Sequence, residues 1–170
     1  MTRLIFLNPE VLGACIYPLP TPDSPFDGKA CNAFKSLITE VDDVAIILLT
    51  TFSPSLERVK SVWAEHGLSG HRMIGIIEDR GGILAPSHSV HNFLFNNKFS
   101  RNPLRFDSFV IIDTMPKEVS YPERLVKVDK LLTYHHVEEA LQILETAFDS
   151  NQVKKGRLLS EHYQGDCVVS

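Results

Sequence analysis

The stretch Val44–Thr50 (VAIILLT) decides the fold class, because six consecutive apolar residues end in a single polar one. A strand that is apolar on both faces is typical of a parallel sheet covered by helices on each side. Such helices are expected on both flanks. Lys29–Val41 repeats apolar residues at a three-and-four spacing. Ser53-Pro54 is typical of a helix start with Ser53 as the N-cap, and this second helix is expected to reach about His66.

The remaining segments alternate in the same way along the chain. The pattern predicts four more strands and two more helices: strands at Arg3–Leu7, Arg72–Ile77, Phe109–Ile112 and Leu125–Val128, and helices at Pro86–Asn96 and Tyr134–Phe148, the last capped by Thr133. Right-handed crossovers then give an α/β domain with a three-layer, Rossmann-like, mostly parallel sheet of about five strands. Residues 1–150 are expected to form this domain, and residues 151–170 a polar extension or tail.

Composition narrows the class of protein. The chain has 170 residues, is 44% hydrophobic, and carries a formal net charge of −4. A mildly acidic protein lacks the positive surface that general nucleic-acid binding needs. The longest apolar run, Val44–Leu49, is far too short to span a membrane. Three widely spaced cysteines do not form a disulfide framework, which favours a cytoplasmic location.

Candidate functional residues are expected where the strands end. In open α/β sheets, ligands bind at the carboxyl ends of the strands. This rule selects four segments, which are Asn8–Glu10, Thr50–Ser53, Glu78–Arg80 and Asp113-Thr114.

Three of these strand ends carry a resemblance to a known family. Phe6–Leu12 (FLNPEVL) resembles the first motif of the haloacid-dehalogenase-like (HAD) phosphohydrolases, an apolar strand followed by Asp-x-Asp-Gly-Val-Leu. Ile46–Thr51 (IILLTT) is similar to the second motif, and Phe109–Thr114 (FVIIDT) to the fourth. Leu125–Leu144 resembles the closing strand and helix of the small, nearly capless members found among RNA-repair proteins. The resemblance spans residues 3–148 and implies an HAD-like fold without a large cap.

The resemblance also implies a role for each strand-end residue. Asn8 stands at the position of the nucleophilic Asp, and Glu10 at that of the general acid and base. Asp113 stands at the position of the carboxylate that binds Mg²⁺, the only cofactor that the resemblance implies. Thr50 stands where a hydroxyl holds the phosphoryl group. Further phosphate-binding candidates are Thr51, Arg80 and Lys98.

The departures from the family pattern suggest two functions. Asn8 is not an anionic nucleophile and is a poor Mg²⁺ ligand, which favours a degenerate phosphotransfer site in a non-catalytic binding or regulatory protein. Its partner would be a phosphorylated small molecule or another protein. The alternative is an active Mg²⁺-dependent phosphohydrolase with an altered mechanism. In that alternative Glu10 and Asp113 hold the metal, and Glu10 is the base that activates water.

A third hypothesis comes from Cys167–Ser170 (CVVS), which has the form of a farnesylation signal on Cys167. A prenylated interaction or effector-like module would associate with a membrane surface through this lipid.

Each strand-end signal also has a purely structural interpretation. Asn8-Pro9 can simply end a strand, since a residue before proline favours extended geometry. Thr50 and Thr51 can cap a strand end, and Glu78–Arg80 can be a solvated turn. The seven histidines lack the compact spacing of a zinc site.

Overall fold

The computed structural model describes residues 1–13, 18–50, 54–78, 86–114 and 121–153, with the backbone alone at 86–89. The predicted order of strands and helices is confirmed, and short 3₁₀ turns are added between them. The elements in chain order are β1 (Thr2–Leu7), η1 (Pro9–Leu12), α1 (Gly28–Glu40), β2 (Val44–Thr50), α2 (Leu56–Glu65), η2 (Gly70–Arg72), β3 (Met73–Glu78), α3 (Pro86–Lys98), β4 (Phe106–Asp113), η3 (Pro122–Arg124), β5 (Leu125–Lys127) and α4 (Tyr134–Glu145).

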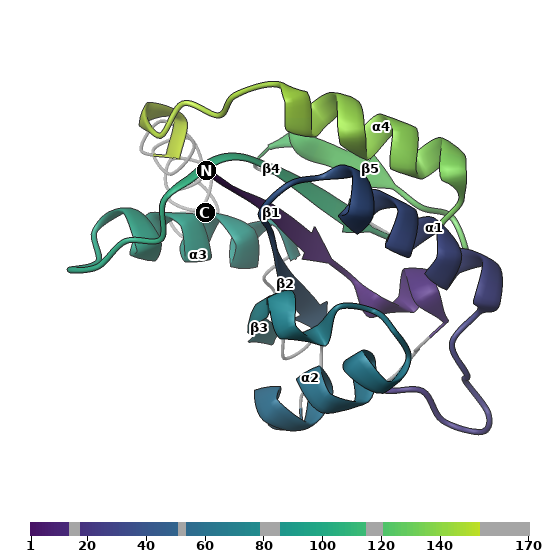
Figure 1. The fold of residues 1–170 in the computed structure, drawn as a ribbon. Helices are drawn as coiled ribbons and strands as arrows, with labels where there is room; N and C mark the ends of the chain where they lie inside the picture. The colour runs from purple at the N-terminus through teal and green to yellow at the C-terminus, as the bar shows by residue number, and fades with distance from the viewer. Residues whose placement is uncertain (14–17, 51–53, 79–85, 115–120, 154–170) are drawn as a thin grey trace, which may run out of the picture.

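The five strands form one sheet in the order β3-β2-β1-β4-β5, and every ladder in it is parallel (Figure 1). The predicted α/β class and three-layer arrangement are therefore confirmed. Because β1 lies between β2 and β4, the ends of the first, second and fourth strands are neighbours. Leu7 is level with Leu48 of β2 and with Ile112 of β4, which aligns the three strand ends closely.

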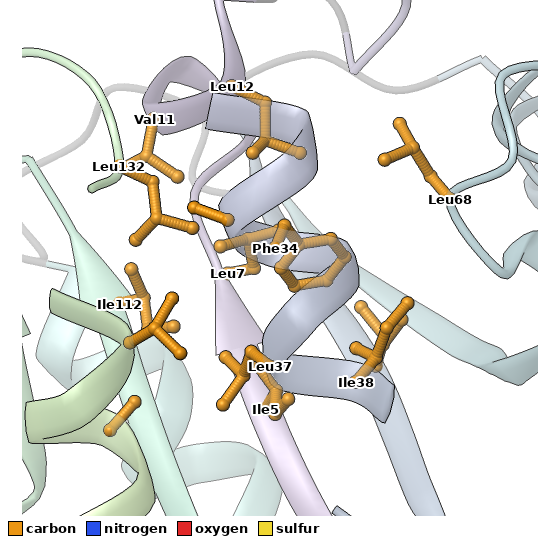
Figure 2. Close-up of a cluster of buried hydrophobic side chains, with 14 of the residues drawn as sticks. Ile5, Leu7, Val11, Leu12, Phe34, Leu37, Ile38, Leu68, Ile112 and Leu132 are labelled. Atoms are coloured by element: carbon orange, nitrogen blue, oxygen red, sulfur yellow. The ribbon is translucent and has the colours of Figure 1, made fainter. Parts of the chain in front are cut away.

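Helices cover both faces of the sheet. Figure 1 shows α1 and α4 side by side along one face, and α3 on the other. The first face builds the larger core with α1, α2 and α4. Figure 2 shows Phe34, Leu37 and Ile38 of α1 against Ile5 and Leu7 of β1, with Leu132 and Ile112 beside them. These side chains are apolar at helical spacing in α1 and at every second position in β1.

The second core, on the face of α3, is rich in aromatic rings. Phe109 of β4 lies with its ring centroid 5.8 Å from that of Phe6, 5.4 Å from Tyr121 and 4.6 Å from Phe148, each in an edge-to-face arrangement. His91 of α3 is buried in the same layer and its Nδ1 lies 2.8 Å from the hydroxyl of Tyr121. His91 therefore has a structural contact in this core.

Arg124 is a buried cation that fastens the end of α4 to the sheet. Its guanidinium donates hydrogen bonds to the carbonyls of Ile143, Thr146 and Ala147 at distances of 2.9–3.2 Å. It also lies over the rings of Phe109 and Phe148. Desolvation lowers the pKa of Arg124. The last carbonyls of a helix carry partial negative charge, which compensates this buried cation.

Three predicted helix boundaries are wrong, and one of them is the end of α3, which lies at Lys98 and not at Asn96. The second helix starts at Leu56, and its N-cap is Ser55, whose hydroxyl accepts the Arg58 N–H at 3.3 Å. Two serines, Ser53 and Ser55, are suited to the N-cap by residue type. Ser55 has the extended backbone that an N-cap requires. Ser53 lies outside the described residues.

The last helix ends at Glu145 and does not reach Phe148. Phe148 instead turns into the second core, and its N–H donates to the carbonyl of Asp107 at 2.7 Å. Burial of Phe148 in the second core therefore accompanies the end of the helix at Glu145.

No helix within the described ranges has the length and apolarity needed to cross a membrane.

Candidate functional site

The candidate site lies at the carboxyl edge of the sheet, where β1 and β4 end side by side. The Asn8 backbone N–H donates to the carbonyl of Ile112 at 2.9 Å, which continues the ladder one residue past β1. Asn8 and Asp113 are therefore level with each other. Side chains alternate between the two faces along a strand, so Asn8 and Asp113 each lie on the same face as the residue two positions earlier. Those earlier residues belong to the second core, and Asn8 and Asp113 therefore share that face of the sheet.

The carboxamide of Asn8 is held at both ends. Its Nδ2 donates to Asp113 Oδ1 at 2.9 Å and to Thr114 Oγ1 at 3.3 Å. Its Oδ1 accepts the backbone N–H of Glu10 at 3.0 Å, so that Asn8 is the N-cap of η1. Asn8-Pro9 is thus both a strand end and a helix cap, and the side chain is fixed by these contacts.

Asp113 is a buried carboxylate, with only 3% of its surface exposed. Its Oδ1 accepts two donors, Asn8 Nδ2 and the backbone N–H of Thr114 at 2.7 Å. A buried carboxylate stays charged only when donors or cations compensate its lost hydration. Here two N–H groups provide part of that compensation.

Glu10 reaches the same point from the first turn of η1. Thr114 Oγ1 lies 3.5 Å from Glu10 Oε2, a long contact that places the Glu10 carboxyl near the Asn8 and Asp113 pair. Partial burial raises the pKa of Glu10, and the negative charge of Asp113 adds to the rise. The hydrogen bond from Thr114 opposes both effects. The four side chains of Asn8, Glu10, Asp113 and Thr114 form one connected group, called the strand-end network below.

Thr50 shares the edge but lies one step further along. Leu49 is the residue of β2 that is level with Asn8, because Leu7 is level with Leu48. Alternation then places Thr50 on the face of Ile46 and Leu48, which belong to the first core. Thr50 pairs in register with Glu78 at the end of β3. The edge is therefore common to Thr50 and Asp113, whereas the face of the sheet is not.

The predicted cation Lys98 lies far from this network. It ends α3, and its Nζ donates to the carbonyl of Ser150 at 3.0 Å, close to Phe148 and the start of β4. A strand and the helix that follows it run in opposite directions. The end of α3 therefore lies where the strands begin, opposite to the carboxyl ends that carry Asn8 and Asp113. Thr51, Arg80 and Cys167 lie outside the described residues, and their suggested roles stay predictions.

Two members of this neighbourhood were missed by sequence reasoning. The sequence places Thr114 only within the Asp113-Thr114 strand end and predicts no role for it, although its hydroxyl bridges Asn8 and Glu10. Lys127, the last residue of β5, is the register partner of Asp113 and is exposed. The sequence signal for Lys127 is its place at a strand end, but β5 is a weak strand whose partner is decided only by the sheet order.

The described side chains do not fit a divalent cation at this position. Within the described ranges no group of three or more His, Cys, Asp or Glu side chains is placed to hold a metal ion. Between the Asn8 position and Asp113, the amide directs an N–H donor at the carboxylate oxygen, where a cation would need acceptor oxygens. Glu10 and Asp113 alone are two carboxylates, and one of them already accepts two hydrogen bonds.

Comparison with protein-family models, with curated proteins and with solved structures finds no match to this chain.

Proposed function

We propose that this protein is a non-catalytic binding or regulatory domain of HAD-like design, whose phosphotransfer site has lost its nucleophile. The observation that carries the proposal is the position of the Asn8 carboxamide. It lies at the strand end where the resemblance places the attacking Asp, and it is tied to Asp113 at 2.9 Å and to the Glu10 N–H at 3.0 Å. The partner proposed for this edge is a phosphorylated small molecule or another protein.

The chemistry of a carboxamide supports this view. Attack on phosphorus needs an anionic oxygen that can form an aspartyl-phosphate. The Asn8 oxygen is neutral and is directed at a backbone N–H, and the nitrogen lone pair is delocalised into the amide. Covalent phosphotransfer through Asn8 is therefore not expected.

The charge balance of the site supports it as well. An Asp at position 8 would face Asp113 as a second carboxylate, and the pair would require a cation. Asn8 removes that charge and supplies an N–H donor in its place. The hydrogen bond from Asn8 thereby replaces the repulsion that a second strand-end carboxylate would add.

A second function, phosphate-ester hydrolysis with Glu10 as the base for water, is favoured by one observation, although the Mg²⁺ that the resemblance implies does not fit the described side chains. The raised pKa of Glu10 brings this carboxyl closer to the range of a general base at neutral pH. In this alternative Lys98 does not bind the phosphate, because it lies at the opposite end of the strands.

Hydrolysis of a generic phosphate ester in the presence of Mg²⁺ distinguishes the two functions. The binding hypothesis expects no turnover by the natural protein and measurable turnover by Asn8→Asp, which restores the nucleophile. Asn32→Asp, an exposed change of the same chemistry on α1, is the matched control and should stay inactive. Turnover by the natural protein that is lost in both Glu10→Gln and Asp113→Ala would refute the binding hypothesis and support hydrolysis.

Calorimetric titration with Mg²⁺ gives an independent measurement. The binding hypothesis expects weak or no heat of Mg²⁺ binding in the natural protein and a clear increase in Asn8→Asp. Tight Mg²⁺ binding by the natural protein would contradict the hydrogen-bonded arrangement of Asn8 and Asp113 on which the proposal depends.

A further inference from the structure

The carboxylate of Asp113 is only partly compensated by its surroundings. Its side chain is 3% exposed, and the hydrogen bonds from Asn8 Nδ2 and from the Thr114 backbone N–H both end on Oδ1. Among the described residues no group donates a hydrogen bond to Oδ2, and this oxygen is not completely enclosed. A buried carboxylate therefore presents one acceptor oxygen without a partner at the carboxyl edge of the sheet.

No cation within the described ranges pairs with this carboxylate. The ion pairs that join described residues lie elsewhere, at Arg3 and at His135. Lys127 is the register partner of Asp113, but its side chain is exposed and forms no ion pair with it. Since a buried charge needs a donor or a cation for the hydration that it loses, Oδ2 of Asp113 is the place where a ligand gains most.

Glu10 brings a second carboxylate to the same place. The hydroxyl of Thr114 lies 3.5 Å from Glu10 Oε2, and the charge of Asp113 is one of the causes that raise the pKa of Glu10. No cation is among the charges that act on Glu10. Two close carboxylates repel each other unless a positive charge is shared between them. A positively charged ligand would relieve this repulsion and complete the hydrogen bonding of Asp113.

The hydrogen-bonding groups of the site favour an organic cation over a metal ion. Mg²⁺ requires acceptor oxygens on all sides, whereas Asn8 Nδ2 directs a donor toward Asp113. A primary ammonium group carries three donors and can use separate acceptors, here Oδ2 of Asp113 and the carboxylate of Glu10. The donors that already occupy Oδ1 of Asp113 stay in place in such a complex.

We propose that the strand-end network binds a primary ammonium group, held between Oδ2 of Asp113 and the carboxylate of Glu10. This inference rests on the proposed function, because it needs a site that has neither a nucleophile nor a metal ion. It also narrows the partner to a molecule that presents an amine, either a free amine or a lysine side chain of another protein. The net charge of −4 attracts such a ligand over longer distances.

Calorimetric titration of the full chain at neutral pH tests the proposal, with butylammonium and with an N-acetylated peptide that contains one lysine as probes. Asp113→Asn is the decisive variant, because its amide oxygen can still accept from Asn8 and Thr114 while a donor replaces Oδ2. We expect both probes to bind the natural protein and to bind Asp113→Asn at least about tenfold more weakly. The probe that binds more tightly identifies the source of the amine.

Asp42→Asn is the matched control for this titration. It is the same change at an exposed carboxylate that precedes β2, at the opposite end of the strands, and it should leave binding of both probes unchanged. Circular dichroism spectra of both variants establish that they fold. Absence of binding of both probes to the natural protein, or equal binding to Asp113→Asn, overturns the proposal.

Lys127 offers a second measurement that leaves the hydrogen bonds of the network untouched. Lys127→Gln removes the exposed cation in register with Asp113, so an ammonium probe should bind about two- to threefold more tightly. Arg105→Gln, an exposed change that precedes β4, is the control and should have no effect. Unchanged or weaker binding of the ammonium probe to Lys127→Gln overturns the proposal, because the ligand would then not lie beside Asp113.

Phosphoserine as a third probe separates this inference from the proposed function. Binding of phosphoserine without binding of either amine would overturn the ammonium inference and leave the non-catalytic site as proposed. Turnover of a phosphate ester by the natural protein would instead refute the proposed function, and that measurement involves no amine. The two failures therefore give different results in separate experiments.

Discussion

The Nδ2 atom of Asn8 lies 2.9 Å from the Oδ1 atom of Asp113, so a strand-end amide partners a buried strand-end carboxylate. The two residues are 105 positions apart in the chain and meet because β1 and β4 are adjacent. The charge and the hydrogen bonding of the site therefore depend on a single atom of residue 8. This atom is a nitrogen that donates in Asn and an oxygen that accepts in Asp.

Changing that atom should alter stability. Asn8→Asp replaces a hydrogen bond by repulsion between two carboxylates, and we expect the free energy of unfolding at neutral pH to fall by about 1–3 kcal/mol. Millimolar Mg²⁺ should restore part of the loss by binding between the carboxylates. Thermal denaturation with and without Mg²⁺ measures both effects, with Asn32→Asp as the control. Equal melting temperatures for Asn8→Asp and the natural protein would contradict the role of this contact.

Glu10 should give the protein a pH-dependent stability. The pKa of Glu10 is raised in the folded state, so protonated Glu10 adds to the free energy of unfolding. This added stability is fully present below the unfolded pKa near 4.5. That contribution is lost as the pH rises through the higher folded value. Relative to Glu10→Gln, the natural protein should therefore lose stability across this window.

Urea denaturation at a series of pH values measures the difference between the Glu10→Gln variant and the natural protein. Glu145→Gln, an exposed change at the end of α4, serves as the control and should give a flat difference curve. A flat curve for Glu10→Gln as well would mean that Asp113 and partial burial do not act on Glu10.

Arg124 should be among the most sensitive polar residues of the protein. Arg124→Met keeps the apolar stem but removes the donors to the carbonyls of Ile143, Thr146 and Ala147. The Ile143 and Thr146 carbonyls keep the Thr146 N–H and the Ser108 hydroxyl as donors, but removing the guanidinium from these partly buried carbonyls should still lower the free energy of unfolding by about 2 kcal/mol. Chemical denaturation checks this, and exposed Arg105→Met should change stability little. A small loss for Arg124→Met would indicate that water replaces the guanidinium.

Gly13 should not tolerate a side chain. Its φ is +100°, and an added Cβ would lie 2.5 Å from the carbonyl oxygen of Pro25. Gly13→Ala is therefore expected to cost more than the roughly 1 kcal/mol of an unfavourable left-handed backbone alone. Gly28→Ala, where a Cβ meets no atom within 4 Å, should be neutral or stabilising. The comparison of their denaturation midpoints decides the point, and equal midpoints would show that the turn after η1 relaxes.

Local pattern was enough to predict most elements. β2 has the predicted bounds, Val44–Thr50, because its uninterrupted apolar run is bordered by polar residues on both sides. The errors lie where two local signals compete or where a distant contact decides. Ser55 replaces Ser53 as a cap, and Phe148 leaves the helical register because Asp107 and Phe109 bind it from β4.

The candidate site was predictable only as a set of strand ends. The sequence indicates that Asn8, Thr50 and Asp113 follow apolar strands, and parallel topology brings such ends to one edge. It does not indicate that Thr50 faces the first core or that Lys98 contacts Ser150 at the opposite edge. Register and helix direction decide those positions, and both arise from packing between segments far apart in the chain.

The amino-acid sequence by itself determined the α/β class, the order of the elements and the amide at position 8, because these depend on local periodicity and on residue identity. Only the tertiary structure decided that Asn8 partners Asp113, that Thr114 joins Glu10 to them, and that β3 is left at the edge. Those relationships depend on which strands are neighbours and on their alignment to within one residue. Such an alignment is set by side chains that pack across the whole core.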